Sequence, residues 1–209
     1  MTILLVAVGL AVGTQLWFLA EYLLHRFAMH ELRGRGLMSR EHLLHHVAAG
    51  WSFSVMHLLS WAGMLLVGVA TWLPLGWLLA GPALGIATTL GWAVGYFFYE
   101  YQHAQAHLRA PRTGYERWLR KHHFHHHFGH PKANHGVSTR TWDRVFGTLE
   151  VPEQVRVPRR MAQPWMLDAS GELRPEHAAD YVLVGSRRSS PVTDEADRVA
   201  AFASTPPAD

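Results

Sequence analysis

The chain contains no cysteine among its 209 residues. Disulfide bonds, thiolate metal sites and cysteine nucleophiles are therefore excluded. A metal ion could be held only by histidine, aspartate or glutamate side chains. Histidine is unusually abundant, because there are 16 histidines and 15 of them fall between His25 and His135. The sequence therefore directs the search for a site to its histidines.

Charged side chains are missing from two long stretches. No Lys, Arg, Asp or Glu occurs from Met1 to Ala20, and none occurs over the 53 residues from Val47 to Tyr99. Runs of this length are not expected in a soluble domain when 17% of the chain is charged. The first run has no basic residue before it and leads into a charged helix end, unlike a secretory signal. We expect an integral membrane protein with a retained first helix.

Three apolar segments are long enough to cross a bilayer, since about 20 helical residues span its hydrocarbon core. They fall within a helix expected over Ile3–His30, an apolar stretch over Trp51–Ala80, and another over Ala83–Tyr101. A short helix over Glu41–His46, capped by Ser39, is expected between the first two. The predicted fold class is an all-α integral membrane protein with about three transmembrane helices and a helical, histidine-rich cap.

Basic residues predict the orientation of these spans. They flank the histidine-rich ends of the apolar segments, while the turn over residues 74–82 carries no charge. The positive-inside rule then places the histidine-rich cap and the C-terminus in the cytoplasm and the N-terminus outside. The same rule explains the net charge of +3 without a nucleic-acid partner, so none is expected.

A change of composition near residue 150 suggests two regions. Residues 1–150 are interpreted as a membrane-embedded domain that carries the histidines, and residues 151–209 as a polar tail. Within the tail, residues 186–209 combine low hydrophobicity with many polar residues, which is typical of disorder. No chemistry is assigned to the tail. His177 is expected to be exposed there, and its replacement is expected to have no measurable effect.

The histidines form four groups with regular spacing. An HxxxxH pattern begins at His25, an HxxHH pattern at His42, an HxxxH pattern at His103, and the fourth group lies in residues 122–127. Residues at i, i+3 and i+4 share one face of a helix, so each HxxHH set can converge. Neutral imidazole is a good ligand for Fe, Zn, Cu and Ni. A single HxxHH pattern on an exposed helix is usually only a solvated face, so the whole set carries the inference.

Several histidines leave alternatives open. In the fourth group, two registers satisfy HxxHH, one beginning at His122 and one at His123. The roles of His125, His130 and His135 are likewise undecided. His57 lies inside an apolar segment, where a satisfied core histidine is the simpler interpretation.

Two carboxylates and one aromatic segment accompany the histidines. Glu21 and Glu100 lie near predicted membrane boundaries, where they could orient ligand imidazoles or pair with a nearby arginine. The segment Trp142–Thr148 is interpreted as a structural turn, because no chemistry requires its Asp–Arg pair.

At this point the sequence resembles the fatty acid hydroxylase/sterol desaturase superfamily, most nearly its fatty acid 2-hydroxylase branch. Glu21–His30 resembles the family's EYxxHRxxxH box, His42–His46 its HxxHH box, and Tyr99–His107 a YDxxHxxxH segment. Leu119–Phe128 resembles LKxxHxxHHF, which selects the register that begins at His123. Two closing stretches, from Asn134 to Ser138 and from Trp142 to Thr148, resemble NFGVS and WDxVFGT, and the resemblance covers roughly residues 17–150.

The resemblance implies ten metal ligands and a pair of metal ions. Iron is expected, zinc could occupy the site in a purified sample, and O2 would be the co-substrate. The ten implied ligands are His25, His30, His42, His45, His46, His103, His107, His123, His126 and His127.

The resemblance also implies an activity, namely hydroxylation of a fatty acyl lipid in the bilayer with O2 and external electrons. No fused cytochrome b5 segment is found, so a separate electron-donor protein of the ferredoxin or cytochrome b5 type is expected. Hydroxylation or desaturation of a sterol or carotenoid is the enzymatic alternative. A histidine-rich membrane metal transporter or sensor is the alternative of another class.

Overall fold

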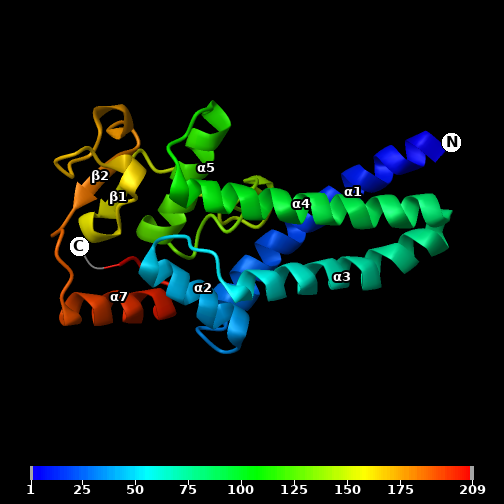
Figure 1. Ribbon diagram of the computed structural model, residues 1–209, viewed down its shortest axis with the longest axis horizontal. Coiled ribbons are helices and arrows are strands. Elements are labelled where there is room, and N and C mark those ends of the chain that lie inside the picture. Colours follow the sequence, from blue (N-terminus) through cyan, green and yellow to red (C-terminus); the bar gives the residue numbers. More distant parts are fainter. Residues whose placement is uncertain (1, 208–209) are drawn as a thin grey trace. The chain divides into compact units, whose positions relative to one another are not determined.

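The computed structural model describes residues 2–207, which are mostly helical (Figure 1). The longer helices are α1 (Thr2–Leu23), α2 (Leu37–Ala48), α3 (Val55–Ala80), α4 (Pro82–Leu108), α5 (Gly114–Phe124) and α7 (Pro191–Ala203). The shorter elements are the π-helices η1 (Leu24–Glu31) and η2 (His125–Gly129), helix α6 (Thr141–Val145), strands β1 (Val155–Pro158) and β2 (Tyr181–Val184), and the 3-10 turns η3 (Arg159–Met161), η4 (Pro164–Met166) and η5 (Pro175–His177).

The chain folds into two compact units, which differ from the division expected near residue 150. The first unit contains residues 2–21 and 52–101, and the second contains residues 22–51 and 102–207. The expected tail belongs to the second unit because its apolar side chains share a core with the histidine-rich helices. Val155 and Val157 of β1 lie in one buried cluster with Phe124 and Phe128.

In the first unit, glycines allow α1 and α4 to approach closely. A Cβ atom on Gly13 would lie 2.0 Å from the carbonyl oxygen of Thr88, and one on Gly91 would lie 2.2 Å from that of Leu10. Small residues at helix crossings are the packing device of membrane proteins, where lipid is as apolar as the side chains. Farther along α1, the Trp17 ring packs edge-on against Trp92 at 5.1 Å.

Helices α3 and α4 form the hairpin that the sequence predicts (Figure 1). A Cβ atom on Gly76 would lie 2.6 Å from the Cα atom of Gly85, so the two helices touch near their turn. The apolar segment expected from Trp51 becomes helical only at Val55, because Ser54 caps α3. His57 is part of this cap, since its Nδ1 accepts a hydrogen bond from the Ser54 backbone N–H at 3.1 Å. It is therefore a half-buried capping residue rather than a core histidine.

Two helices in the described chain, Thr2–Glu31 and Val55–Ala80, are long and apolar enough to cross a membrane. The third expected span, in α4, is not among them. Its glycines, threonines and tyrosines dilute its apolar character, although no charge interrupts the segment before Glu100.

The second unit is not purely helical, so the all-α prediction needs correction. Strands β1 and β2 pair in parallel, with Val155 opposite Tyr181. Their buried side chains belong to one cluster with Phe124, Met166 and Trp165. The sequence contained two four-residue β-strands, which are too short to stand out from the surrounding turns.

The segment expected to be disordered instead contains helix α7. Ser190 and Thr193 form a capping box at its start, and Pro191 occupies the first helical position. Arg160 donates two hydrogen bonds to the buried Asp197 carboxylate, at 2.6 and 2.8 Å. A polar composition had suggested disorder, but a paired, buried charge anchors this helix to the rest of its unit.

Helix α2 also begins earlier than expected. Ser39 lies inside it, fully buried, and does not act as its cap. The Ser39 hydroxyl donates to the Met29 carbonyl at 2.7 Å and accepts from the Gly34 backbone N–H at 2.8 Å. It therefore ties the connecting segment to η1.

Candidate metal centre

Ten histidines lie in two groups of five within the second unit, and they are the same ten that the resemblance to the family implies as ligands. In each group the candidate ligand atoms all lie within 4.8 Å of one another. We call them group A and group B. Group A consists of His25, His30, His42, His46 and His126, and group B of His45, His103, His107, His123 and His127.

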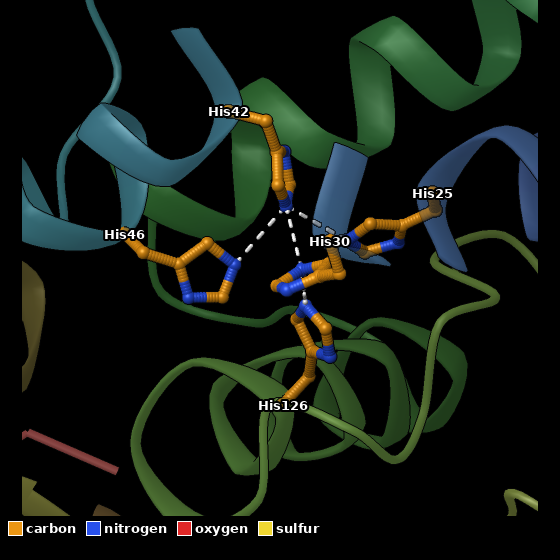
Figure 2. Close-up of side chains that lie close together, drawn as sticks. All are labelled: His25, His30, His42, His46 and His126. Atoms are coloured by element: carbon orange, nitrogen blue, oxygen red, sulfur yellow. Dashed lines mark hydrogen bonds between the residues drawn. The ribbon is translucent and has the colours of Figure 1, made fainter. Parts of the chain in front are cut away.

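In group A, three imidazoles surround the Nε2 atom of His42, and a fourth joins them through His30. Figure 2 shows His25 and His30 of η1 and His46 of α2 around His42, with His126 of η2 against His30. The His42 Nε2 atom lies 3.0 Å from that of His25, 2.9 Å from that of His30 and 3.1 Å from that of His46. The His126 Nε2 atom lies 3.0 Å from that of His30. These nitrogens face a common point.

Group B has the same character and adjoins group A. The Nε2 atoms of His103 and His45 lie 3.1 Å apart, and those of His107 and His123 lie 3.0 Å apart. The rings of His46, in group A, and His127, in group B, stack at 4.1 Å. The arrangement therefore offers two neighbouring nitrogen cages.

The HxxxxH spacing is accommodated by a π-helix, which sequence reasoning missed. Five residues apart on an α-helix, His25 and His30 would point about 140° apart. In η1, however, the backbone bonds from i to i+5, which brings such residues nearly onto one face. Their ring centroids are 5.2 Å apart. The spacing itself was the available signal, because it fits no α-helical face.

Each HxxHH box divides between the groups rather than converging on one point. On α2, His42 and His46 lie about 40° apart around the axis and enter group A, whereas His45 lies about 100° from His46 and enters group B. In the fourth segment, His123 and His127 enter group B while His126 enters group A. One helix thus serves both cages.

Backbone carbonyls orient several of these rings. With hydrogen on Nδ1, the ring donates to a carbonyl and turns the Nε2 lone pair toward the cage. The donor–acceptor pairs are His25 with the His135 carbonyl, His45 with that of Gly50, His107 with that of Ala49 and His126 with that of Ala133. These four rings therefore do not need Glu21 or Glu100, which the sequence offered as carboxylates that could orient ligand imidazoles. Glu100 instead accepts a hydrogen bond from Trp61 Nε1 at 3.3 Å.

His30 is oriented by the C-terminal segment, to which the sequence assigned no chemistry. The Ser204 hydroxyl lies 3.1 Å from His30 Nδ1, and both side chains are buried. We expect Ser204→Ala to weaken metal binding roughly tenfold, because hydrogen-bond partners of ligand imidazoles typically contribute that much. Metal titration of the purified protein would measure the change. Unchanged affinity would show that the hydroxyl has no such role.

Burial keeps the candidate ligands neutral. Desolvation, followed by repulsion from neighbouring imidazoles, holds the pKa of His42, His46, His123, His126 and His127 well below the usual 6.5. A neutral imidazole has a free lone pair, so these rings are available as ligands at physiological pH.

The lowered pKa values make the stability of the metal-free protein depend on pH. Below about pH 6.5 the unfolded chain takes up protons on these histidines while the folded chain does not. The free energy of unfolding therefore decreases as the pH is lowered. Each histidine contributes up to ~1.4 kcal/mol per pH unit until its folded pKa is reached. We therefore expect the melting temperature of the metal-free protein to drop between pH 7.5 and 5.5. A flat profile across that range would contradict burial of these rings.

The remaining histidines of the fourth segment serve other partners. His125 and His130 each hydrogen-bond to the Glu150 carboxylate, at 2.8 and 2.7 Å. His122 is buried beside Asp143, with Nε2 3.5 Å from Oδ2. His135 is also buried, and desolvation lowers its pKa to about 3.

His177 was expected to be exposed, but it is buried. Only 8% of its surface is accessible, and its ring packs edge-on against Trp165 at 5.1 Å. The core formed by the tail encloses it, so its replacement cannot serve as a silent control. His130, whose side chain is 45% exposed, is the better choice.

The segment Trp142–Thr148 is structural, as expected, and it supports the site. The buried Asp143 carboxylate accepts hydrogen bonds from the backbone N–H groups of His135 and Gly136, each at 2.8 Å. It also accepts one from the Thr148 hydroxyl at 2.8 Å. It thereby fixes the peptide whose carbonyl orients His25.

Apolar helices together with two groups of largely buried imidazoles define a membrane-associated protein with a candidate dinuclear metal centre. The family model described as fatty acid hydroxylase matches residues 10–148, more than half of the chain. The chain belongs to this family.

Curated relatives agree with this membership. The human protein named fatty acid 2-hydroxylase is 34% identical over 148 residues, which are 68% of this chain and 39% of that protein. Dihydroceramide fatty acyl 2-hydroxylase FAH2 of Arabidopsis thaliana is 32% identical over 66% of this chain and 59% of its own length. Ceramide very long chain fatty acid hydroxylase scs7 of Schizosaccharomyces pombe is 28% identical over 66% and 41%. The chain therefore spans about two fifths to three fifths of these relatives. No solved structure matches it significantly.

Proposed function

We propose that the chain is a membrane-bound di-metal oxygenase that hydroxylates a fatty acyl chain. The observation that carries the proposal is the division of ten imidazoles, seven of them buried and three half-buried, into two adjacent groups of five. Ten nitrogen ligands exceed what one ion can take, and five for each ion leave a position for another ligand. The printed names of the relatives supply the substrate class, because each is a fatty acid or fatty acyl hydroxylase.

The nitrogen spacing supports ions with more than four ligands. For metal–nitrogen bonds of about 2.0–2.1 Å, neighbouring nitrogens lie ~2.8–3.0 Å apart around an octahedral ion and ~3.3–3.4 Å apart around a tetrahedral one. The closest Nε2 separations in the two groups are 2.9–3.1 Å. Separations of this size are compatible with an octahedral ion, and five nitrogens in each group, rather than four, suit iron better than four-coordinate zinc.

Two bound iron ions would supply the oxidant, using O2, two electrons and two protons to place one oxygen atom in a C–H bond and release the other as water. The protein's own contribution is positional. Buried carbonyls and Ser204 hold the Nε2 atoms toward the cages, and the low pKa of the rings keeps their lone pairs free. The surrounding burial keeps water away from the ligands.

The membrane arrangement belongs to the same proposal. Three spans, with the histidine groups and the C-terminus in the cytoplasm, would let an acyl chain lie in the bilayer while electrons arrive from water. A separate ferredoxin or cytochrome b5-type protein would donate those electrons. The basic residues that flank the histidine-rich segments support this orientation.

The test combines metal analysis with lipid analysis. The full chain, purified in detergent after expression with iron, should hold two metal ions. Supplied with isotopically labelled O2, a reduced ferredoxin and fatty acyl lipids, it should produce a hydroxylated acyl chain that carries the label. Labelled sterol or carotenoid with no acyl product would favour the alternative substrates. An iron-loaded protein that labels no lipid with any donor would overturn the proposal.

A further inference from the structure

A pocket of about 470 Å³ lies beside group A, within the second unit. Four cationic side chains line it: Arg26, Arg33, Arg35 and Lys132. Its inner wall includes His30 and Ser204, which are joined by a hydrogen bond. A ligand in this pocket would therefore lie against His30, which is itself a candidate metal ligand of group A.

The pocket carries an excess of uncompensated positive charge. Its single carboxylate, Glu31, is paired with Arg26 at 3.2 Å. Among residues 2–207, no carboxylate lies within ion-pair distance of Arg33, Arg35 or Lys132. Like charges gathered around a concavity repel one another and attract an anion. Three cations in excess suit a phosphate better than a single carboxylate, and Arg is well shaped for phosphate oxygens.

The backbone is bent to form this wall. Arg33 has φ of +50°, which is uncommon for a residue with a side chain, and it is followed by Gly34 with φ of +84°. The Phe202 ring of α7 leaves no room for a side chain at Gly34, since a Cβ atom there would lie 2.5 Å from it. Strained conformations of this kind persist where the surrounding structure imposes them, often at binding sites.

Apolar side chains in the same segment favour a lipid as the source of the phosphate. Leu32 precedes Arg33, and Leu37 and Met38 follow Arg35 after one glycine; these three apolar side chains are 45%, 60% and 37% exposed. Exposed apolar residues beside cations are typical of a surface that contacts lipid headgroups. The cavity is larger than a phosphate needs and falls in the usual ligand range of ~300–1,000 Å³, so further headgroup atoms fit.

We propose that this pocket binds the phosphate of a lipid headgroup and so seats the polar end of a lipid beside group A. The inference deepens the proposed function and rests on it for the identity of the lipid as substrate. The binding itself can be measured without any turnover.

The test uses the full, metal-loaded chain in neutral detergent. Binding is measured to phosphatidylglycerol in mixed micelles of that detergent, to diacylglycerol, which lacks phosphate, in the same micelles, and to inorganic phosphate alone. We expect saturable binding to phosphatidylglycerol and none to diacylglycerol. Inorganic phosphate that binds the pocket as tightly as the lipid would assign it to a soluble phosphate and overturn the lipid source.

Variants separate a specific pocket from general attraction to an anionic surface. Lys132→Gln and Arg35→Gln should each weaken phosphatidylglycerol binding roughly fivefold, as expected for a cation near a lipid phosphate. Arg188→Gln, an exposed arginine outside the pocket, is the matched control and should change little. Ala203→Trp should fill the cavity without changing its charge, and should also abolish saturable binding.

The decisive result is that of Ala203→Trp, with metal content measured to show that the chain remains folded. Normal phosphatidylglycerol binding by a metal-loaded Ala203→Trp protein would overturn the pocket, while leaving the oxygenase proposal intact. Conversely, the protein could bind phosphatidylglycerol through the pocket and yet oxidise no lipid. That result would support the binding site and contradict the proposed function.

Discussion

His126→Ala should abolish lipid hydroxylation and release one of two metal ions, while membrane insertion remains intact. His126 is fully buried, and its Nε2 atom lies 3.0 Å from that of His30 in group A. The Ala133 carbonyl accepts from the other ring nitrogen at 2.7 Å and so fixes the direction of Nε2, which an alanine cannot supply. Metal analysis and product analysis of the purified variant would measure both effects. We expect product to fall at least ~100-fold, at the upper end for a disturbed metal site.

The matched control is His130→Ala, four residues farther along the same segment. His130 lies outside both groups and pairs with the Glu150 carboxylate at the surface. Its replacement should leave two metals and nearly full activity. If the two variants lost metal and activity equally, the loss would reflect general damage to the segment. Retained hydroxylation in the His126→Ala protein would contradict the assignment of group A.

Asp143→Ala should lower the free energy of unfolding more than any other substitution proposed for this protein. The carboxylate is fully buried and accepts hydrogen bonds from two backbone N–H groups and the Thr148 hydroxyl. Its removal leaves buried donors without an acceptor, at a cost of about 3 kcal/mol or more. In a chain of this size that corresponds to a drop in melting temperature of roughly 6–12 °C. Thermal unfolding in detergent would measure it.

The Asp143→Ala substitution should also weaken metal binding, and it should affect group A before group B. Asp143 holds the peptide of His135, whose carbonyl orients His25 in group A. Group A should therefore lose its metal before group B does when the variant is titrated with a chelator. Arg144→Ala, a change at the exposed neighbour, is the control and should leave both stability and metal content unaltered. Simultaneous release of both metals would contradict this route.

The resemblance to the family could single out the ten candidate ligands because it rests on the spacing and flanks of the histidines, which are local information. The choice between the registers at His122 and His123 is one example. Resemblance to the family favoured His123, and the structure places His123 in group B and His122 beside Asp143. The α3–α4 hairpin was likewise predictable, since an uncharged run with a Gly–Pro break has few alternatives.

Other features required the folded chain. A polar composition suggested disorder after residue 186, yet the buried pair between Arg160 and Asp197 anchors a helix there. Ser204 reaches His30 across 174 positions of sequence, and no local pattern indicates such a contact. The predicted exposure of His177 was wrong for the same reason, because the rings packed against it, Trp165 and Tyr181, lie in elements too short to recognise.

The sequence by itself determined which side chains could bind metal and which segments could enter a bilayer, because both depend on residue type and short-range spacing. Only the tertiary structure decided how the ten imidazoles are shared between two cages. That division depends on the π-helical turn at His25–His30, on the angle at which each helix meets the others, and on carbonyls that aim each ring. Such directions arise from packing between distant segments, which local spacing does not encode.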